Sequence, residues 1–215
     1  MSDAASHPPQ DHFAGSLIER LDPALDAFLD SAARVETVCE GFVWSEGPVW
    51  KDGALLFSDV PANILYRWGP GSKQAEVFLE PSGGIATNPD FVEPGSNGLA
   101  LDREGRLLLC QHGARRVVRL EDDKRTQTVL ADRFEGRRFN NPNDLVVHSS
   151  GAVYFTDPSY GFKGRDASPL KEIAWNGVYR IAPDQTVSLL TKDLPFPNGI
   201  AFSPDEKTLY VAVSD

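Results

Sequence analysis

The sequence lacks the features that would mark a membrane protein, a secreted protein or a nucleic-acid-binding protein. It contains no run of 18 apolar residues, so no transmembrane helix is expected. Residues 1–13 are polar, include two prolines and have neither the basic start nor the apolar centre of a secretory signal, so a cytoplasmic location is expected. Basic residues are few. The 21 Lys and Arg against 31 Asp and Glu give a net charge of −10, which argues against nucleic acid or an anionic membrane as a partner.

Several catalytic motifs are also missing. There is no CxxC, HExxH, Walker A loop or GxGxxG fingerprint, and the absence of GxSxG removes support for a serine nucleophile. Only two cysteines occur, Cys39 and Cys110. Cys110 ends an apolar run of three leucines and is predicted to be buried in a strand, so both cysteines are expected to be free thiols.

What the chain does contain is a repeat of about fifty residues. Each unit begins with an oxygen-bearing side chain, runs through an apolar stretch, turns at a glycine or a charged residue, and enters a second apolar stretch. The units open at Glu46, Asn97, Asn143 and Asn198, which lie 51, 46 and 55 residues apart. A period in this range with β-rich units is typical of propellers and other repeat proteins.

The pattern predicts an all-β protein with a short helix near its start. Residues 35–215 alternate between short β-rich runs and turns rich in Gly, Pro, Asp and Asn, as expected for a partial β-propeller with three to four strands per blade. Residues 1–34 are predicted to be a disordered N-terminus and a short helix, because residues 16–33 have a helical apolar spacing that Pro23 interrupts. Segments 80–96 and 158–175 are expected to form loops at the mouth of the channel.

The opening residues predict a site as well as a fold. Equivalent blade positions converge on the channel of a propeller, so one Glu and three Asn side chains are expected to face a common axis. Such hard oxygen donors suit Ca²⁺ or Mg²⁺ better than Zn²⁺. Asn-Gly and Asn-Asp pairs are also common turn formers, but three at repeat spacing with a Glu in the fourth place favour a metal site. Trp44 and Trp50 are expected to be packing residues.

These motifs resemble the SMP-30/gluconolactonase family, and the resemblance implies a calcium-dependent, six-bladed β-propeller. It covers roughly residues 35–215, and the bacterial gluconolactonases are the subgroup that the sequence looks most like. The segments that carry it are 45–50, 94–99, 108–113, 141–144, 154–158 and 197–205. Six blades need about 300 residues. The chain is therefore expected to supply about four blades of a longer protein, truncated at its C-terminus. A closed four-bladed ring and an oligomer that completes the ring are the alternatives.

The resemblance also assigns roles to individual residues. Glu46 matches the first metal-binding carboxylate of the family, Asn143 the asparagine at the metal and substrate, and Asn198 a later metal-binding asparagine. A further ligand, an aspartate, belongs to a following blade beyond the end of the sequence. The metal implied is Ca²⁺, with Mg²⁺, Mn²⁺ or Zn²⁺ as other divalent candidates.

The expected activity is that of a metal-dependent lactonase that opens a sugar lactone such as gluconolactone, the metal polarising the carbonyl for attack by water. Asn97, Asn143 and His112 are candidate substrate-binding residues. Asp215, Asp157 and His112 are candidate catalytic residues, since a carboxylate would accept the proton of water. Both aspartates could instead cap backbone amides, and His112 could simply close its blade.

Two alternatives stay open at this point. One is a phosphotriester or aryl-ester hydrolase with the same metal cage, and the other is a propeller that binds a partner without catalysis. If the ring is open, the chain is expected to be an inactive fragment. A small-molecule lactone is the partner that the main hypothesis requires.

Overall fold

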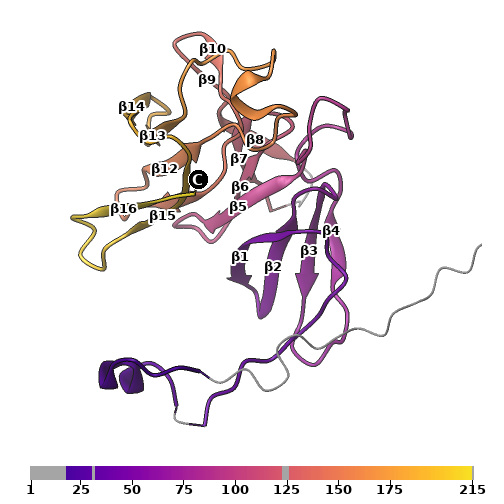
Figure 1. Ribbon diagram of the computed structural model, residues 1–215, viewed down its shortest axis with the longest axis vertical. Coiled ribbons are helices and arrows are strands. Elements are labelled where there is room, and N and C mark those ends of the chain that lie inside the picture. The colour runs from indigo at the N-terminus through magenta and orange to yellow at the C-terminus, as the bar shows by residue number, and fades with distance from the viewer. Residues whose placement is uncertain (1–17, 31, 123–125, 215) are drawn as a thin grey trace, which may run out of the picture.

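The computed structural model describes residues 18–30, 32–122 and 126–214, and these residues form a series of antiparallel sheets (Figure 1). The first sheet contains β1 (Ser45–Lys51), β2 (Ala54–Asp59), β3 (Ile64–Trp68) and β4 (Glu76–Leu79). The second contains β5 (Ser96–Leu101), β6 (Leu107–Gln111), β7 (Arg116–Leu120) and β8 (Gln127–Ala131). The third contains β11 (Leu145–Val147), β12 (Val153–Asp157), β13 (Gly177–Ile181) and β14 (Val187–Thr191).

A two-stranded sheet of β15 (Pro197–Phe202) and β16 (Leu209–Val213) follows the third sheet. The first strands of successive sheets contact one another, β1 with β5, β5 with β11 and β11 with β15. Within the described residues the chain therefore forms three complete propeller blades and two strands of a fourth, which confirms the predicted fold. A small hairpin, β9 (Arg133–Phe134) and β10 (Arg137–Arg138), was not predicted.

The blades hold together because apolar side chains fill the space between adjacent sheets. All five residues of β6 are buried, since both faces of the second blade are covered by its neighbours. One core cluster joins the first and second blades around Leu56, Leu65 and Leu109. The other joins the second and third blades, where the rings of Phe155 and Tyr179 stack at 5.4 Å. Each blade is thus stabilised chiefly by the next one rather than by a core of its own.

The face of the first blade that points away from the second blade is only partly covered. Register places Trp50, Leu55 and Trp68 side by side on this face, and Trp50 is 54% exposed. Phe42, from the segment before β1, covers one end with its ring 4.8 Å from that of Phe57. Trp44 is 61% exposed as well. The expectation that Trp44 and Trp50 are packing residues is therefore wrong, because no described sheet packs against this face.

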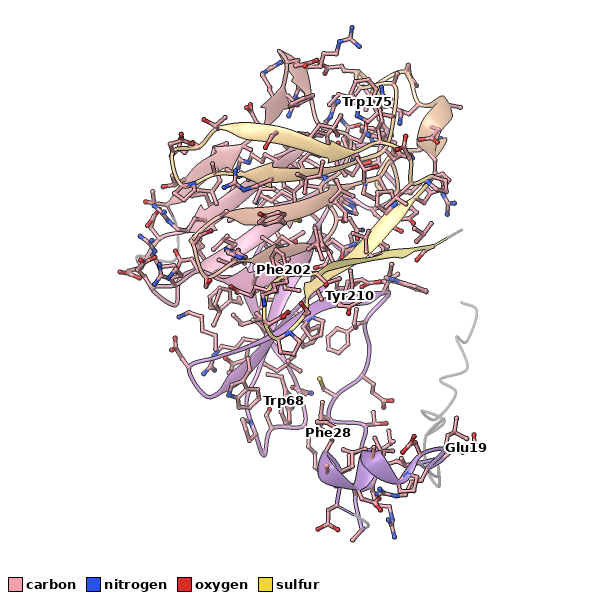
Figure 2. The ribbon with its side chains drawn as sticks, turned by 90° about the vertical axis from the view of Figure 1, so that its left-hand side faces the viewer. Glu19, Phe28, Trp68, Trp175, Phe202 and Tyr210 are labelled. Carbon is pink, nitrogen blue, oxygen red and sulfur yellow. The ribbon has the colours of Figure 1, made fainter. Side chains whose placement is uncertain are left out.

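In residues 18–30 and 32–44, which precede the first blade, the structure has a single short helix. Helix η1 (Pro23–Ala27) is one 3-10 turn, capped by the Asp22 side chain, which accepts a hydrogen bond from the Ala24 amide at 2.8 Å. Over the described part of the predicted helix at 16–33, only this one turn is formed, since Pro23 lacks an amide hydrogen and Asp22 before it is extended. Phe28 is 83% exposed and lies apart from the sheets (Figure 2). The predicted disorder of residues 1–15 falls outside the described residues.

No helix in the described part of the chain is long and apolar enough to cross a membrane. Cys39 and Cys110 are both free thiols, as predicted, and Cys110 is fully buried.

Candidate functional site

The four opening residues of the repeat occupy the starts of neighbouring inner strands. Glu46 and Asn97 are the second residues of β1 and β5, Asn198 is the second residue of β15, and Asn143 lies two residues before β11. Because these strands contact one another in turn, the structure brings the four positions to one end of a common bundle of inner strands. We call Glu46, Asn97, Asn143 and Asn198 the opening ring.

Backbone atoms, rather than side chains, set the spacing of the opening ring. The Gly98 amide donates to the Asn143 carbonyl oxygen at 2.6 Å, which joins β5 directly to the start of the third blade. A methyl group on Gly98 would lie 2.6 Å from the Asp144 Cα atom, and one on Gly47 would lie 2.2 Å from the Asn97 carbonyl oxygen. The glycines of the repeat are therefore required for close approach of the strands.

Asp144 stands where the other units have glycine, and it connects the third and fourth blades. Its Oδ1 accepts a hydrogen bond from the Leu145 amide at 2.9 Å, and its Oδ2 accepts one from the Ile200 amide at 3.0 Å. Burial raises the pKa of the Asp144 carboxyl, and these two amides act in the opposite direction. The Asp144 side chain thus links the third blade to the fourth, as the Gly98 backbone amide links the second blade to the third.

A second set of bonds joins the middle of each blade to the ring. Ser58 of β2 donates its hydroxyl to the Asn97 carbonyl oxygen at 2.9 Å, and Thr156 of β12 donates to the Asn198 carbonyl oxygen at 2.7 Å. The register of β5 with β6 places Cys110 at the same position in the second blade. By analogy with Ser58 and Thr156, Cys110 would face the Asn143 carbonyl oxygen. That oxygen already accepts the hydrogen bond from the Gly98 amide.

Asn143 has the property expected of a ligand-binding residue. Its side chain is only 2% exposed, and its Oδ1 atom is buried without a hydrogen-bond partner in the described structure. Leaving such an acceptor unsatisfied is costly, so buried polar atoms without partners call for an explanation such as an ion or a water. An amide oxygen at this point fits a hard divalent cation.

The charge around the ring also suits a cation. Burial, followed by the negative charge of Glu46, raises the pKa of Glu93, while Arg165 acts in the opposite direction. Glu46 likewise contributes to the raised pKa of Asp144. Glu46 is half-buried and accepts a hydrogen bond on Oε1 from the Trp44 indole at 2.8 Å. The negative charge of Glu46 therefore acts on two other carboxyl groups near the opening ring, those of Glu93 and Asp144.

Asn198 is half-buried, and its Nδ2 donates to the Ser214 hydroxyl at 3.2 Å. Across residues 18–30, 32–122 and 126–214, no three His, Cys, Asp or Glu side chains gather as a metal centre. A metal at the ring would thus depend on amide oxygens together with the Glu46 carboxylate, which is the donor set that the sequence predicted.

His112 lies directly after β6 and is completely buried. Its Nδ1 lies 3.2 Å from the Glu93 carbonyl oxygen and 3.8 Å from the Glu93 Oε2 atom, whereas its Nε2 has no partner in the described structure. Burial lowers the pKa of His112 to about 4, with the bond to Glu93 acting against it. The His112 imidazole is therefore neutral at physiological pH.

The two long loops expected at the channel mouth do meet. Phe91 and Phe162 form an antiparallel bridge, and their rings lie 5.5 Å apart. The Val92 amide donates to the Gly161 carbonyl oxygen at 2.9 Å, and the Lys163 amide donates to the Asp90 carbonyl oxygen at 2.8 Å. We call segments 80–96 and 158–175 the rim loops. They hold Glu93 against His112.

Asp157 is placed as a backbone cap. It is fully buried, and its Oδ2 accepts a hydrogen bond from the Asn140 amide at 2.8 Å. Asp59, which also ends the second strand of its blade, accepts bonds from the amides of Val43 and Trp44 in the same way. The Oδ2 contact fits the capping role that its sequence left open, whereas the Oδ1 atom is buried without a hydrogen-bond partner in the described structure. Asp215, the other candidate carboxylate, lies outside the described residues.

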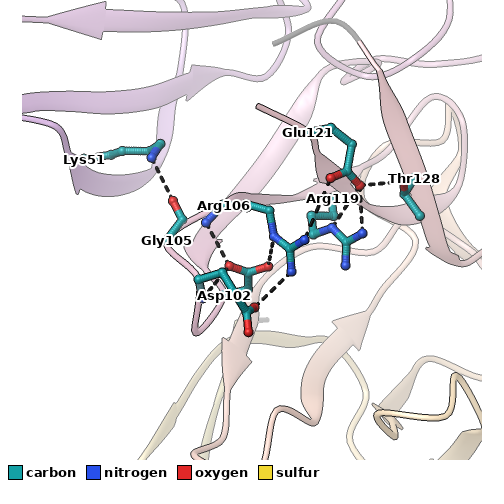
Figure 3. Close-up of polar contacts among 8 residues, drawn as sticks. Lys51, Asp102, Gly105, Arg106, Arg119, Glu121 and Thr128 are labelled. Carbon is teal, nitrogen blue, oxygen red and sulfur yellow. Dashed lines mark hydrogen bonds and ion pairs between the residues drawn. The ribbon is translucent and has the colours of Figure 1, made fainter. Parts of the chain in front are cut away.

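A pocket of about 290 Å³ opens at the opposite end of the inner strands, between the second and third blades. Most of its charged groups are paired: Arg106 pairs with Asp102 and Glu104, and Arg119 pairs with Glu121 (Figure 3). The Arg106 Nε atom donates to the Asp102 Oδ2 atom at 2.7 Å. This network fastens turns of the propeller together, and the pocket lies away from the opening ring.

Sequence reasoning missed Glu93, Asn141 and Asp144. Asp144 could have been noticed, because it replaces the glycine of the other units. Asn141 lies in a motif that the resemblance used, but nothing in its sequence context marks its side chain as unpartnered. Glu93 is a lone acidic residue in a long loop, and only the folded rim loops bring it to His112.

The fold and the opening ring together define a β-propeller with oxygen donors at one end of its channel. A family description, the SMP-30/Gluconolactonase/LRE-like region, matches residues 44–215, and the chain belongs to this family. The gluconolactonase of Zymomonas mobilis is 45% identical over 202 residues, covering 92% of this chain and 56% of the relative.

Two solved structures agree with this assignment. The gluconolactonase of Xanthomonas campestris is 34% identical with a TM-score of 0.66, covering 80% of this chain and 55% of the other. A structural-genomics X-ray structure, assigned as a gluconolactonase, is 30% identical with a TM-score of 0.77, covering 90% of this chain and 64% of the other. The chain thus spans between 55% and 64% of the length of these three relatives.

Proposed function

We propose that the chain carries the metal-binding and substrate-contacting part of a divalent-cation-dependent lactonase, with Ca²⁺ as the preferred ion and a sugar lactone such as gluconolactone as the substrate. The observation that carries the proposal is the buried, unpartnered Oδ1 of Asn143 in an opening ring of oxygen donors that also includes Glu46. The 45% identity to a gluconolactonase supports the choice of substrate.

The residues of the ring would share the work. Glu46, Asn143 and Asn198 would hold the cation, which supplies electrophilic polarisation of the lactone carbonyl when it is bound. The neutral amides keep more of the charge of the ion available than carboxylates would. Asn97, buried beside Asn143, would orient the lactone, and the rim loops would limit the access of bulk water.

In the reaction, water adds to the lactone carbonyl carbon, the ring C–O bond breaks, and the ring oxygen leaves as a hydroxyl after gaining a proton. A carboxylate must take the proton of the attacking water. Asp157 and Asp215 are the candidates for this role: one oxygen of Asp157 caps the Asn140 amide and the other is unpartnered in the described structure, and Asp215 is a candidate on its sequence position.

A non-catalytic propeller has no need for an unsatisfied buried acceptor at the ring, which favours a ligand-binding function over a scaffold. A phosphotriester or aryl-ester hydrolase would use the same cation, so an assay is needed to separate these activities from lactonase activity.

Calorimetric titration of the chain with CaCl₂ tests the proposal directly. We expect saturable binding that is lost in Glu46→Gln and kept in Glu104→Gln, a matched change in the turn at the opposite end of β5, where the Glu104 side chain is 66% exposed. Acid release from glucono-1,5-lactone, compared with hydrolysis of a phosphotriester, then assigns the substrate. Absence of Ca²⁺ binding by folded wild-type protein would overturn the metal assignment, and faster phosphotriester turnover would overturn the substrate assignment.

A further inference from the structure

The protonation pattern of His112 follows from its neighbours. A carbonyl oxygen can only accept a hydrogen bond, so the contact from His112 Nδ1 to the Glu93 carbonyl oxygen at 3.2 Å requires the proton on Nδ1. The Nε2 atom is buried and has no partner among the described residues. A proton there would leave a buried cation without an acceptor, so Nε2 carries a lone pair.

Asn141 presents a second acceptor close by. Its Nδ2 donates to the His112 carbonyl oxygen at 3.2 Å, which fixes the orientation of the amide. Its Oδ1 is therefore turned away from that bond, and it too is buried without a partner in the described structure. Asn141 and His112 are both completely buried. Two neighbouring side chains thus each carry one unsatisfied acceptor.

Tight packing against the rim loops maintains this arrangement. A methyl group on Gly161 would lie 2.9 Å from the Asn141 Nδ2 atom and 3.0 Å from the Glu93 carbonyl oxygen. The two loops are joined beside this point by the bond from the Val92 amide to the Gly161 carbonyl oxygen. The orientation of both acceptors therefore depends on Gly161 and on the backbone of Glu93.

We propose that His112 Nε2 and Asn141 Oδ1 form a hydroxyl-binding subsite, and that the Glu93 main chain is the positioning group that fixes the His112 tautomer. The subsite rests on the proposed lactonase function, and it takes hydroxyl groups of the substrate other than the reacting carbonyl. Because the His112 Nε2 and Asn141 Oδ1 atoms can only accept hydrogen bonds, a ligand in the subsite must donate them. A polyhydroxylated lactone does so, whereas an unsubstituted lactone or a phosphotriester does not.

Two histidine variants separate the acceptor from the rest of the side chain. His112→Asn keeps a donor near Nδ1 for the Glu93 carbonyl but removes the acceptor, whereas His112→Gln can place an amide oxygen near the position of Nε2. With Ca²⁺ present, we expect His112→Asn to lower kcat/KM for glucono-1,5-lactone about ten- to a hundredfold. Hydrolysis of δ-valerolactone, which has no hydroxyl groups, should change less than about twofold, since it makes no bond to this acceptor.

His112→Gln should recover part of the activity on glucono-1,5-lactone. His148→Gln is the control, because His148 pairs with Ser150 and Glu206 in the β11–β12 turn, away from the opening ring. Equal losses on both lactones in His112→Asn would mean a structural role and would overturn the subsite. If wild-type protein hydrolyses neither lactone, the proposed function fails, and the subsite is decided by spectroscopy alone.

Nitrogen-15 spectra of the imidazole provide that independent readout. The chain has four histidines, so the spectrum of His112→Asn identifies the His112 signals by difference. We expect a protonated Nδ1, an unprotonated Nε2, and a shift of the Nε2 signal when D-gluconate is added but not when δ-valerolactone is added. Gly161→Ala should displace the Glu93 carbonyl oxygen and so allow both tautomers of His112. Glu93→Gln should keep the tautomer with the proton on Nδ1, because the main-chain carbonyl of residue 93, and not its side chain, fixes that tautomer.

A protonated Nε2 in the free protein would overturn the proposal. So would an Nε2 signal that already shows hydrogen bonding and does not respond to D-gluconate, since water alone would then fill the subsite.

Discussion

Asp157 is predicted to make the stability of the fold depend on pH with a definite sign. It is completely buried, and burial raises the pKa of its carboxyl to about 7, although the Asn140 amide and the positive charges of Arg115 and Lys171 favour ionisation. Between about pH 4 and pH 7 the folded chain keeps a proton that the unfolded chain has released. The unfolding free energy therefore falls as pH rises through this window.

The magnitude follows from the difference in proton affinity. A roughly thousandfold tighter binding of the proton in the folded state corresponds to about 4 kcal/mol of stability present at pH 4 and lost above pH 7. Asp157→Asn keeps the shape and still offers an oxygen to the Asn140 amide, which donates to the carboxylate at 2.8 Å. The variant should match wild type near pH 4 and become progressively more stable than wild type up to pH 8.

Urea denaturation at several pH values between 4 and 8 measures this difference. Other carboxylates titrate in both proteins, so only the gap between the variant and wild type is attributed to Asp157. Asp59→Asn is the matched comparison, because Asp59 ends the equivalent strand but accepts two amides, from Val43 and Trp44. It should destabilise the fold at pH 7 by about 1–3 kcal/mol through loss of charge-assisted hydrogen bonds. A difference in unfolding free energy between Asp157→Asn and wild type that does not change with pH would refute the reasoning.

Three further predictions concern the joints between blades and are checked by urea denaturation at pH 7. Ser58→Ala and Thr156→Val each leave a buried carbonyl without its hydroxyl donor, so each should cost about 1–3 kcal/mol; a smaller loss in Ser58→Ala than in Ser45→Ala, an exposed control, would contradict this. Gly98→Ala places a methyl group 2.6 Å from the Asp144 Cα atom and should lower the unfolding free energy by at least about 3 kcal/mol. Gly53→Ala is the control: it has open space around it but φ +72°, and it should lower the unfolding free energy by about 1 kcal/mol. Similar losses in the two variants would count against the backbone contact of Gly98. Arg115 donates to the Phe139 carbonyl oxygen at 2.6 Å and to Glu172 at 3.1 Å, so Arg115→Lys should lower the unfolding free energy by about 3 kcal/mol. Arg103→Lys, on the surface, is the control. An equal loss in both variants would contradict the prediction.

The repeat made most of the fold predictable. Strand β13 (Gly177–Ile181) and strand β3 (Ile64–Trp68) begin and end where the sequence places them, because glycines, prolines and asparagines punctuate short runs of β-branched and aromatic residues. The N-terminal helix was overpredicted, since apolar spacing stabilises a helix only when its apolar face finds a partner, and Leu21 is 85% exposed. The exposure of Trp50 could not be predicted either, because it depends on which sheet lies beside the first blade.

The candidate site was predictable only where it follows the repeat. Glu46, Asn97, Asn143 and Asn198 occur at equivalent places along the chain, and equivalence in sequence became equivalence in space. The contact between Glu93 and His112 has no such signal, because it joins a residue of a rim loop to the end of a strand. Its formation depends on the bridge between Phe91 and Phe162, a pairing of two irregular segments 71 residues apart along the chain.

The direct backbone contacts of Gly47 and Gly98 with the next inner strand have a consequence for how such a protein can change over evolutionary time. Side chains on the outer strands can be exchanged for larger or smaller ones, and the blades can tilt to accommodate them. The distance between successive inner strands is set by main-chain atoms in contact, and main-chain atoms do not vary with sequence. The oxygen donors at the strand starts are thereby insulated from drift in the rest of each blade, so that their relative positions can persist while the outer surface diverges.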